Sequence, residues 1–308
     1  MTTPLSLTFI GLGVMGYPMA GHWSQTPHRV RVYNRTASKA QQWAAEYTGD
    51  TAHTLEDAVS GAHVVALCVG NDHDVWQVLD AIIPHLKAGA VVIDHTTTSA
   101  DLARRAYHRL AERSVGFVDA PVSGGERGAQ TGQLTIMCGG DAQVIEAMHP
   151  IMNHYAQHIA HMGPAGMGQT TKMVNQICIA GLVQGLAEGV HFAQQAGLDV
   201  NAVVDVISKG AAGSWQMVNR AHTMDANHYD HGFAVDWMRK DLNICLNAAQ
   251  AMGVSLPVTA LVDQFYQDVQ SMGGGRWDTS SLLARLHALK PIAPHPMTQT
   301  TTQDEAEQ

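Results

Sequence analysis

A glycine-rich segment near the N-terminus, residues 9–23 with the sequence FIGLGVMGYPMAGHW, constrains the fold of this chain more than any other feature. Its glycines have the spacing G-x-G-x-x-G between the end of a β-branched run and the start of a helical pattern. In such a turn the first glycine makes the bend, the second lets the backbone approach a pyrophosphate, and the third lets helix and strand pack closely. The positive end of the helix then faces the phosphate charge. This context favours a dinucleotide-binding turn over a plain tight turn, and its predicted members are Gly11, Gly13, Val14, Met15 and Gly16.

Short β-branched runs alternate with amphipathic helical patterns up to about residue 162. The predicted strands cover residues 5–10, 29–33, 63–69, 90–94, 116–119, 133–138 and 158–162. The predicted helices between them cover residues 15–23, 38–46, 74–83, 100–113 and 142–152. Strands and helices that alternate in this way are typical of βαβ units and a mostly parallel sheet.

After Gly163 the strand signal ends and every further pattern is helical. Residues 165–196 can form one long helix, in which Gly181, Gly185 and Gly189 share a face and would let another helix approach closely. Further helices are predicted over residues 200–208, 236–252, 256–272 and 280–288.

These patterns predict two domains and a tail. The fold class is an α/β Rossmann-type N-terminal domain plus an all-α C-terminal domain, joined by the long helix. The predicted boundaries are residues 1–163 for the dinucleotide-binding domain and 164–292 for the helical domain. Residues 293–308 are polar and predicted to be a disordered tail.

Charge and composition narrow the class of partner. The net charge is −9 and the longest run of lysine or arginine is two residues, which argues against nucleic acid or an anionic membrane surface as the main partner. Four separated cysteines in apolar runs predict buried, reduced thiols: Cys68, Cys138, Cys178 and Cys245. We find no signal peptide and no apolar run of about 18 residues, so we predict a cytoplasmic protein without a membrane partner.

Eighteen histidines raise the question of a metal site. The segment HYAQHIAH, residues 154–161, runs into a predicted strand, where its spacing would not bring the imidazoles together. Neither this segment nor HYDH, residues 228–231, completes a ligand set. We predict no metal site.

The end of the second predicted strand bears on cofactor choice. An acidic residue there would hold the ribose 2′-hydroxyl of NAD(H). This chain instead has Asn34, Arg35 and Thr36, a set that suits a 2′-phosphate. We therefore favour NADP(H) over NAD(H). The alternative is that Arg35 stacks on the adenine and Asn34 accepts either cofactor.

A second candidate site follows the strand at residues 116–119. Ser123, Gly124 and Gly125 form a small, flexible turn whose backbone N–H groups and hydroxyl could cradle a carboxylate. Taken alone, the same segment could be a plain surface turn.

The long helix carries a third candidate site. Lys172, Asn175 and Gln176 lie at positions i, i+3 and i+4 and can face one spot. A lone lysine could extend to solvent along its apolar stem. Beside two amides, however, it is suited to giving a proton or hydrogen bond to a carbonyl, and burial would lower its pKa toward the working range. Lys240 and Asp241, by themselves, predict a solvated charge pair.

Taken together, these segments resemble the β-hydroxyacid dehydrogenase family, which includes 3-hydroxyisobutyrate dehydrogenases, tartronate semialdehyde reductases and glyoxylate/succinic semialdehyde reductases. Four blocks carry the resemblance in order: FIGLGVMGYPMA, DAPVSGGERGAQTGQLTIMCGG, GPAGMGQTTKMVNQ and KDLNI. It extends from Leu7 to about Leu289. The segment IDHTTTS, residues 93–99, is similar to the family segment near the nicotinamide.

The resemblance implies a role for each candidate residue. Lys172 would be the general acid in reduction and the general base in oxidation. The substrate would be bound by Ser123, Gly124, Gly125, Asn175 and Gln176. Val69, Gly70 and Thr96 would line the cofactor cleft, and Lys240 would reach toward the nicotinamide. Substrate choice would depend on residues around Gln176, Ser214, Trp215 and Phe233.

The resemblance also leaves alternatives open. Many members have asparagine at the position of Gln176, whereas the tartronate semialdehyde reductases share the Asn-Gln pair of this chain. Asn34-Arg35-Thr36 is instead more similar to the NADPH-dependent glyoxylate/succinic semialdehyde reductases. We expect an NADP(H)-preferring oxidoreductase of a small, carboxylate-bearing carbonyl or hydroxy acid, built as a homodimer or homotetramer. The alternatives are an NAD-dependent 3-hydroxyisobutyrate-type dehydrogenase and a non-catalytic cofactor-binding module.

Overall fold

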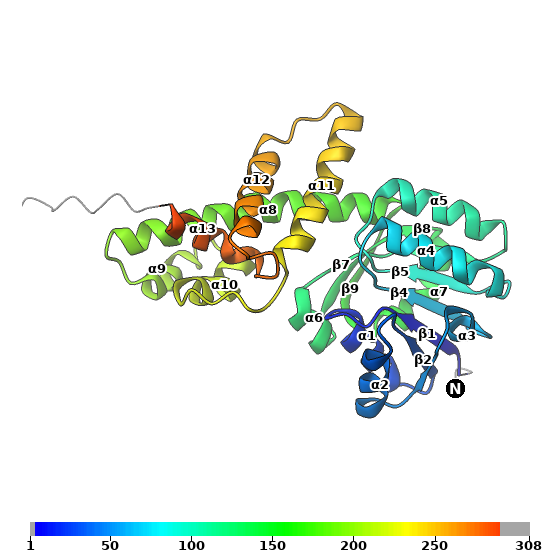
Figure 1. The fold of residues 1–308 in the computed structure, drawn as a ribbon. Helices are drawn as coiled ribbons and strands as arrows, with labels where there is room; N and C mark the ends of the chain where they lie inside the picture. The colour runs from blue at the N-terminus through cyan, green and yellow to red at the C-terminus, as the bar shows by residue number, and fades with distance from the viewer. Residues whose placement is uncertain (1–3, 290–308) are drawn as a thin grey trace, which may run out of the picture.

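A nine-stranded sheet forms the N-terminal half of the molecule (Figure 1). The fold is described from a computed structural model over residues 4–289, so the predicted tail, 293–308, lies outside the described residues. The strands run in the order β3-β2-β1-β4-β5-β6-β8-β7, and β9 pairs with β8. Their bounds are β1 Ser6–Ile10, β2 Arg29–Tyr33, β3 Asp50–Thr51, β4 Val64–Leu67, β5 Val91–Asp94, β6 Gly116–Asp119, β7 Val122–Ser123, β8 Leu134–Gly140 and β9 Ala156–Gly163.

The strands from β3 to β6 are parallel, and β8 is antiparallel to both β6 and β7. Ile10 of β1 lies opposite Tyr33 of β2 and Leu67 of β4, so the carboxyl ends of these strands meet at one edge. The chain order reverses on either side of β1. Open parallel sheets bind ligands at such a switch point, beyond the carboxyl ends of the strands.

Helices cover both faces of the sheet. Successive residues of one strand enter opposite cores: Phe9 belongs to the core that contains Trp23 and Trp43, while Ile10 belongs to the core that contains Leu79 and Leu110. Burial on both faces explains the continuous β-branched runs. The covering helices are α1 Gly16–Ser24, α2 Ala37–Glu46, α3 Leu55–Val59, α4 Asp72–Ile82, α5 Ala100–Ala111, α6 Gly125–Thr131 and α7 Ala142–Met152, with a 3₁₀ turn, η1, at Ile83–His85.

The helix α8, Met167–Gln195, leaves the sheet and runs through the helical half (Figure 1). It has the length and hydropathy of a membrane-spanning helix. Its side chains Ala180, Val183 and Ala187, however, are fully buried in a core shared with the helices that follow, so α8 is the central helix of this half. Those helices are α9 Val200–Ile207, α10 Trp215–Asp225, α11 Val235–Met252, α12 Pro257–Ser271 and α13 Leu282–Ala288, with a 3₁₀ turn, η2, at Thr279–Ser281.

The fold class is confirmed, and every predicted strand and helix within the described residues is present. The elements β3, β7, α3, α6 and α10 were not predicted. β3 and β7 have two residues each, too few to show alternation, and α6 opens with two glycines of positive φ. The burial prediction for cysteines was wrong at Cys178, which is exposed because it lies on the outer side of α8.

Candidate active site

The three glycines of the first turn have three different physical roles. Gly11 has a φ of +98°, and a Cβ there would overlap the carbonyl oxygen of Cys68 at the end of β4. A Cβ at Gly16 would overlap the carbonyl oxygen of Gly11 and lie 2.9 Å from the Phe9 ring. A Cβ at Gly13 would meet no atom within 4 Å among residues 4–289. Gly13 therefore borders open space, and a ligand could approach the protein backbone closely at this position.

The start of α1 fits an anion. Within the described chain, its first turn has no acidic residue and no side chain caps its first N–H groups, since Met15 is at the N-cap. Val14, before it, is more than half exposed. The side chain of Asn34 accepts a 2.9 Å hydrogen bond from the N–H of Leu12 and so joins the ends of β1 and β2. The turn and helix together match a pyrophosphate cradle.

Replacing Gly13 by alanine is expected to weaken dinucleotide binding about tenfold without changing the thermal stability of the free protein. The added methyl group meets no protein atom but enters the space beside the phosphate turn. Calorimetric titration and thermal unfolding measure the two quantities. Gly16→Ala serves as the contrast and should lose stability, because its methyl overlaps the Gly11 carbonyl. A Gly13→Ala variant that binds as tightly as the original chain would contradict this role.

Arg35 follows β2, and its side chain is 87% exposed. Its Nη1 lies 3.7 Å from Oδ1 of Asp74, at the start of α4. The Asn34 amide donates to the carbonyl oxygen of Thr36, which orders the backbone around the arginine. The guanidinium is thus largely exposed beside the carboxyl end of β2, with Asp74 as its partner.

The ends of β4 and β5 are tied together beside this edge. The N–H of Val69 donates to the Thr96 hydroxyl at 3.0 Å, and the N–H of Thr96 donates to Asp94 Oδ1 at 3.0 Å. Trp237 of α11 faces Gly70, where a Cβ would lie 3.5 Å from its ring. Val69, Gly70 and Thr96, which the family resemblance implies would line one cleft, therefore lie together.

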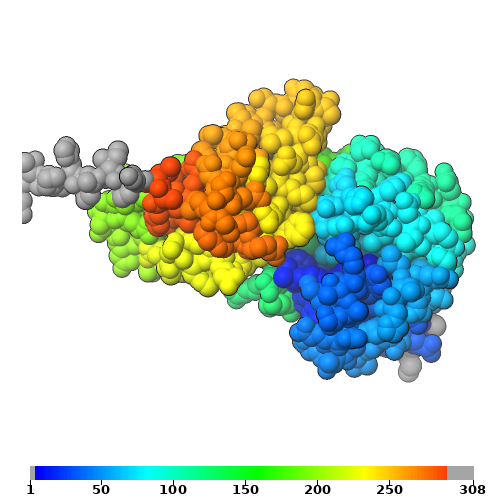
Figure 2. Space-filling model, in the orientation of Figure 1, coloured from blue at the N-terminus to red at the C-terminus, as the bar shows by residue number. Residues whose placement is uncertain are grey.

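The helix α11 of the helical half contacts the loop that follows β5. Lys240 donates from Nζ to the carbonyl oxygen of Thr97 at 2.6 Å. Figure 2 shows the two halves in contact in space-filling form, with α11, in yellow, against the blue-to-cyan N-terminal half. Lys240 therefore extends from the helical half to the loop after β5, and its reach toward the nicotinamide stays a prediction.

Lys172 is buried near the start of α8, with 8% of its surface exposed. Its Nζ donates a 2.9 Å hydrogen bond to the carbonyl oxygen of Val122. Burial lowers the pKa of the Lys172 ammonium, Asp241 opposes that change, and the charge of Lys240 adds to it. A lysine with a lowered pKa exchanges its proton more readily near neutral pH.

The turn after Val122 lies next to this ammonium. Ser123 belongs to β7 and pairs with Thr135 of β8. Gly124 and Gly125 have φ values of +128° and +62°, so this backbone shape depends on glycine. The bond from Lys172 to Val122 brings the lysine within one residue of Ser123. The turn and the lysine therefore form one site, although they are distant in sequence.

The prediction of a solvated pair at Lys240 and Asp241 was wrong. Asp241 is only 2% exposed, because α11 packs this face against α8. Its Oδ2 accepts a 2.6 Å hydrogen bond from the Gln176 amide, and its Oδ1 lies 3.1 Å from Lys240 Nζ. Asn175 donates to Gln176 Oε1 at 2.7 Å. Two ammonium groups, Lys172 and Lys240, thus accompany one carboxylate, an excess of positive charge that favours an anionic ligand.

Sequence reasoning missed Asp94, Gln169 and Trp237. Asp94 and Gln169 have no exposed surface, and Trp237 belongs to the other half of the molecule. Of the three, only Gln169 carried a signal, since it precedes Lys172 by three residues on the same helix and is polar in a buried stretch.

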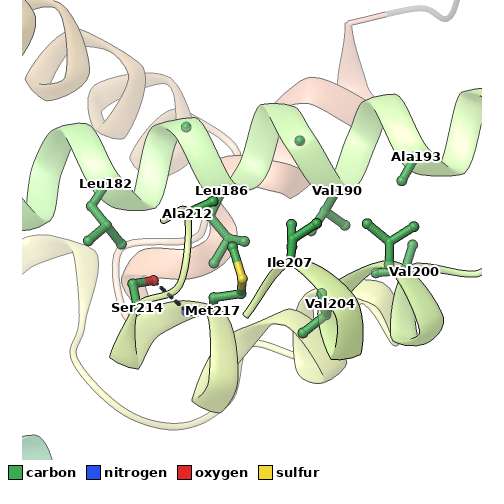
Figure 3. Close-up of a pocket in the computed structure, with 13 residues that line it drawn as sticks. Leu182, Leu186, Val190, Ala193, Val200, Val204, Ile207, Ala212, Ser214 and Met217 are labelled. Atoms are coloured by element: carbon green, nitrogen blue, oxygen red, sulfur yellow. Dashed lines mark hydrogen bonds between the residues drawn. The ribbon is translucent and has the colours of Figure 1, made fainter. Parts of the chain in front are cut away.

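The apolar pocket in Figure 3 is separate from these residues. It has a volume of about 280 Å³ and lies between α8, α9 and the start of α10. Gly185 and Gly189 form part of its wall, and a Cβ at either would meet no atom within 4 Å in the described chain. Ser214, expected near the substrate, lines this pocket and caps α10 by accepting from the N–H of Met217.

Comparison with known proteins gives the family. Residues 6–163 match the family model described as the NAD-binding domain of 6-phosphogluconate dehydrogenase. Residues 166–286 match the model described as NAD-binding of NADP-dependent 3-hydroxyisobutyrate dehydrogenase. The two matches adjoin at the start of α8.

Several relatives align over nearly their full length. The chain is 56% identical to an uncharacterized oxidoreductase of Shewanella frigidimarina, over 91% of this chain and 97% of that protein. It is 31% identical to the 2-hydroxy-3-oxopropionate reductase of Escherichia coli, over 94% and 99%. A solved 3-hydroxyisobutyrate dehydrogenase of Mycobacterium tuberculosis with L-serine is 26% identical, with a TM-score of 0.83 over 94% of this chain and 100% of that one. The chain therefore belongs to the β-hydroxyacid dehydrogenase family, whose members are NAD(P)-dependent oxidoreductases acting on hydroxyl or carbonyl groups.

Proposed function

We propose that the chain is an NADP(H)-preferring oxidoreductase that moves a hydride between the nicotinamide and a small semialdehyde or β-hydroxy acid. The observation that carries this proposal is the buried Lys172, which bonds to the Val122 carbonyl beside the Ser123–Gly125 turn. A bound nicotinamide would supply or accept the hydride. The protein residues then bind the carboxylate, orient the carbonyl and move one proton.

Each residue has a task in this proposal. In reduction, Lys172 gives a proton from Nζ to the carbonyl oxygen as the carbonyl carbon gains the hydride, and in oxidation the neutral amine takes that proton back. Ser123, Gly124 and Gly125 hold the substrate carboxylate with a hydroxyl and backbone N–H groups. Gln176, fixed by Asp241, and Asn175, fixed by Gln176, orient the substrate.

A cofactor oxidation screen tests the activity. NADPH and NADH are offered in parallel with glyoxylate, succinic semialdehyde, tartronate semialdehyde and methylmalonate semialdehyde. Faster turnover with NADPH on at least one acid is the expected result. If neither cofactor is oxidised with any of the four acids, although fluorescence confirms cofactor binding, the result would instead support the non-catalytic module or a different class of carbonyl substrate.

A second candidate is the NAD-dependent oxidation of a β-hydroxy acid. The contact between Arg35 and Asp74 favours it, because a carboxylate partner competes with a 2′-phosphate for the guanidinium. One relative, 31% identical, is named an NAD-dependent L-serine dehydrogenase. Initial rates with NAD⁺ and NADP⁺ on 3-hydroxyisobutyrate and L-serine separate the two candidates.

Arg35→Ala is expected to weaken NADPH binding about 10- to 100-fold and to leave NADH binding nearly unchanged, since a charge-assisted contact to the 2′-phosphate is lost. Equilibrium titration with both cofactors measures this. Arg31→Ala is the matched control, because Arg31 lies on β2, just before Arg35, but its side chain donates to the carbonyl oxygen of Asp57. An equal loss for both cofactors would indicate adenine stacking and would contradict NADP(H) selection by Arg35.

We also propose that the chain acts as a homodimer or homotetramer. Ile207 of α9 lines the pocket in Figure 3, and α8 and α9 also carry apolar side chains that are largely exposed in the single chain, among them Phe192 and Val206. A second copy of the chain would cover them. Light scattering on the purified protein gives the number of copies. A cytoplasmic location stays a prediction.

A further inference from the structure

Gln169 bonds through both ends of its side-chain amide near the site, and the proposed mechanism does not use it. It has no exposed surface. Its Nε2 donates to the carbonyl oxygen of Thr96 at 2.7 Å, and its Oε1 accepts from the N–H of Thr98 at 3.0 Å. One amide thus bonds to both ends of a three-residue loop that lies 71 to 73 residues earlier in the chain.

The backbone of Gln169 is itself fixed to the sheet. Asp119, at the end of β6, accepts from the N–H of Gly166 at 2.8 Å and from the N–H of Gln169 at 2.9 Å. A Cβ at Gly168 would overlap the carbonyl oxygen of Met137, so the start of α8 lies as close to β8 as a backbone can. The amide of Gln169 therefore extends from an anchored point.

The loop that Gln169 holds borders the second half of the dinucleotide cleft. The phosphate turn follows β1, and a dinucleotide crosses the switch point from the β2 side to the side of β4 and β5. Arg35 lies on the first side, so the nicotinamide half belongs on the second, at the ends of β4 and β5. Thr96, which binds the N–H of Val69, and Thr97, which accepts from Lys240, form that end.

Lys172 lies three residues after Gln169, about one turn further along α8. One rigid turn of helix therefore carries both the amide that holds the nicotinamide-side loop and the ammonium that serves the substrate. We propose that Gln169 is a positioning residue that sets the spacing between the nicotinamide and Lys172. This inference rests on the proposed function.

The residue type is specific to this task. The loop presents one acceptor, Thr96 O, and one donor, the N–H of Thr98, so its partner must donate and accept at once. Glutamine does both, whereas ionised glutamate accepts only and leucine does neither. An unpaired buried carbonyl or N–H would shift the loop to find a partner.

Binding measurements test the proposal without turnover. Gln169→Leu and the near-isosteric Gln169→Glu are titrated by calorimetry with NADP⁺ and with its adenine half, 2′,5′-ADP, and in parallel with NAD⁺ and ADP. We expect each variant to bind the full dinucleotide about tenfold more weakly and the adenine half unchanged, because about 1.4 kcal/mol is lost only at the nicotinamide end. Gln184→Leu is the control: Gln184 is buried on the same helix, and its amide donates to Glu188.

Catalysis gives a second measurement. Gln169→Glu should lower kcat more than it raises the substrate KM, and should increase the isotope effect on kcat with 4-deuterated cofactor, because the hydride step becomes slower. An equal loss for dinucleotide and adenine half, or no loss for either, would overturn the proposal. If the original chain binds neither NADP⁺ nor NAD⁺, the proposed function itself fails. If it binds but turns over no substrate, the calorimetric comparison still decides the role of Gln169.

Discussion

Replacing Lys172 by methionine is expected to lower kcat by about 10²–10⁴-fold, the usual cost of losing a positioned acid. Methionine keeps most of the apolar stem in the buried site and removes only the ammonium that now bonds to Val122. Dinucleotide affinity should be almost unchanged, since the phosphate turn is formed by β1 and α1. Steady-state rates in both directions, with cofactor titration beside them, measure the two effects.

The control for this substitution is Lys87→Met. Lys87 also donates to a backbone carbonyl, that of Gly61, but on the exposed surface. The Lys87→Met variant should retain full activity. Turnover by Lys172→Met at the original rate would remove the lysine from the mechanism.

The pH profile gives an independent signature of the same lysine. Reduction requires the ammonium and oxidation requires the neutral amine. Reduction should therefore decline as pH rises through the pKa of Lys172, which burial lowers, and oxidation should increase over the same range. Both limbs should be absent from the residual activity of Lys172→Met.

Replacing Asp94 by asparagine is expected to remove a pH-dependent loss of stability. Burial raises the pKa of the Asp94 carboxyl from 3.8 to about 7, and its Oδ2 has no hydrogen-bond partner within residues 4–289. Between those values the folded chain binds a proton that the unfolded chain releases, so the free energy of unfolding falls as pH rises. At about 1.4 kcal/mol per pH unit, the loss reaches about 4 kcal/mol by pH 7.

Asparagine cannot ionise, and it retains an oxygen to accept from the N–H of Thr96. The variant should match the original chain near pH 4 and exceed it by up to about 4 kcal/mol above pH 7. Urea unfolding of the cofactor-free protein from pH 4 to 8, followed by the fluorescence of the buried Trp23 and Trp43, measures the difference. Parallel curves for the two proteins would show that Asp94 does not titrate in this window.

The parts of the fold that depend on local sequence could be predicted from it. Gly16 is required by overlaps within one strand-turn-helix unit, and the glycine spacing between a strand pattern and a helix pattern indicated the turn. Gly11 depends in part on a distant contact, because its Cβ would overlap the carbonyl oxygen of Cys68 at the end of β4. The parallel strands β4 and β5 are buried on both faces, and their apolar runs VVAL and VVI follow from that burial. Lys172, Asn175 and Gln176 were found by helical spacing, which is also a local property.

The partners in the site could not be predicted, because each joins elements distant in sequence. Lys240 and Asp241 are an ordinary charged pair in the sequence, and only the close packing of α11 on α8 buries Asp241 against Gln176. The hydrogen bonds of Gln169 also could not be predicted, because its partners Thr96 and Thr98 lie beside it only in the folded chain. Short elements such as β7 also require partners, since two residues form a strand only when another strand bonds to them.

The sequence by itself determined the class of fold and indicated the glycine turn and Lys172 as candidate site residues, because period, glycine spacing and helical register act over a few residues. The tertiary structure alone decided which charges are buried, which loop α8 holds, and how the helical half meets the strand ends. Burial and hydrogen bonding between segments depend on where the chain returns in space, and these decide whether a polar residue faces solvent or belongs to a site.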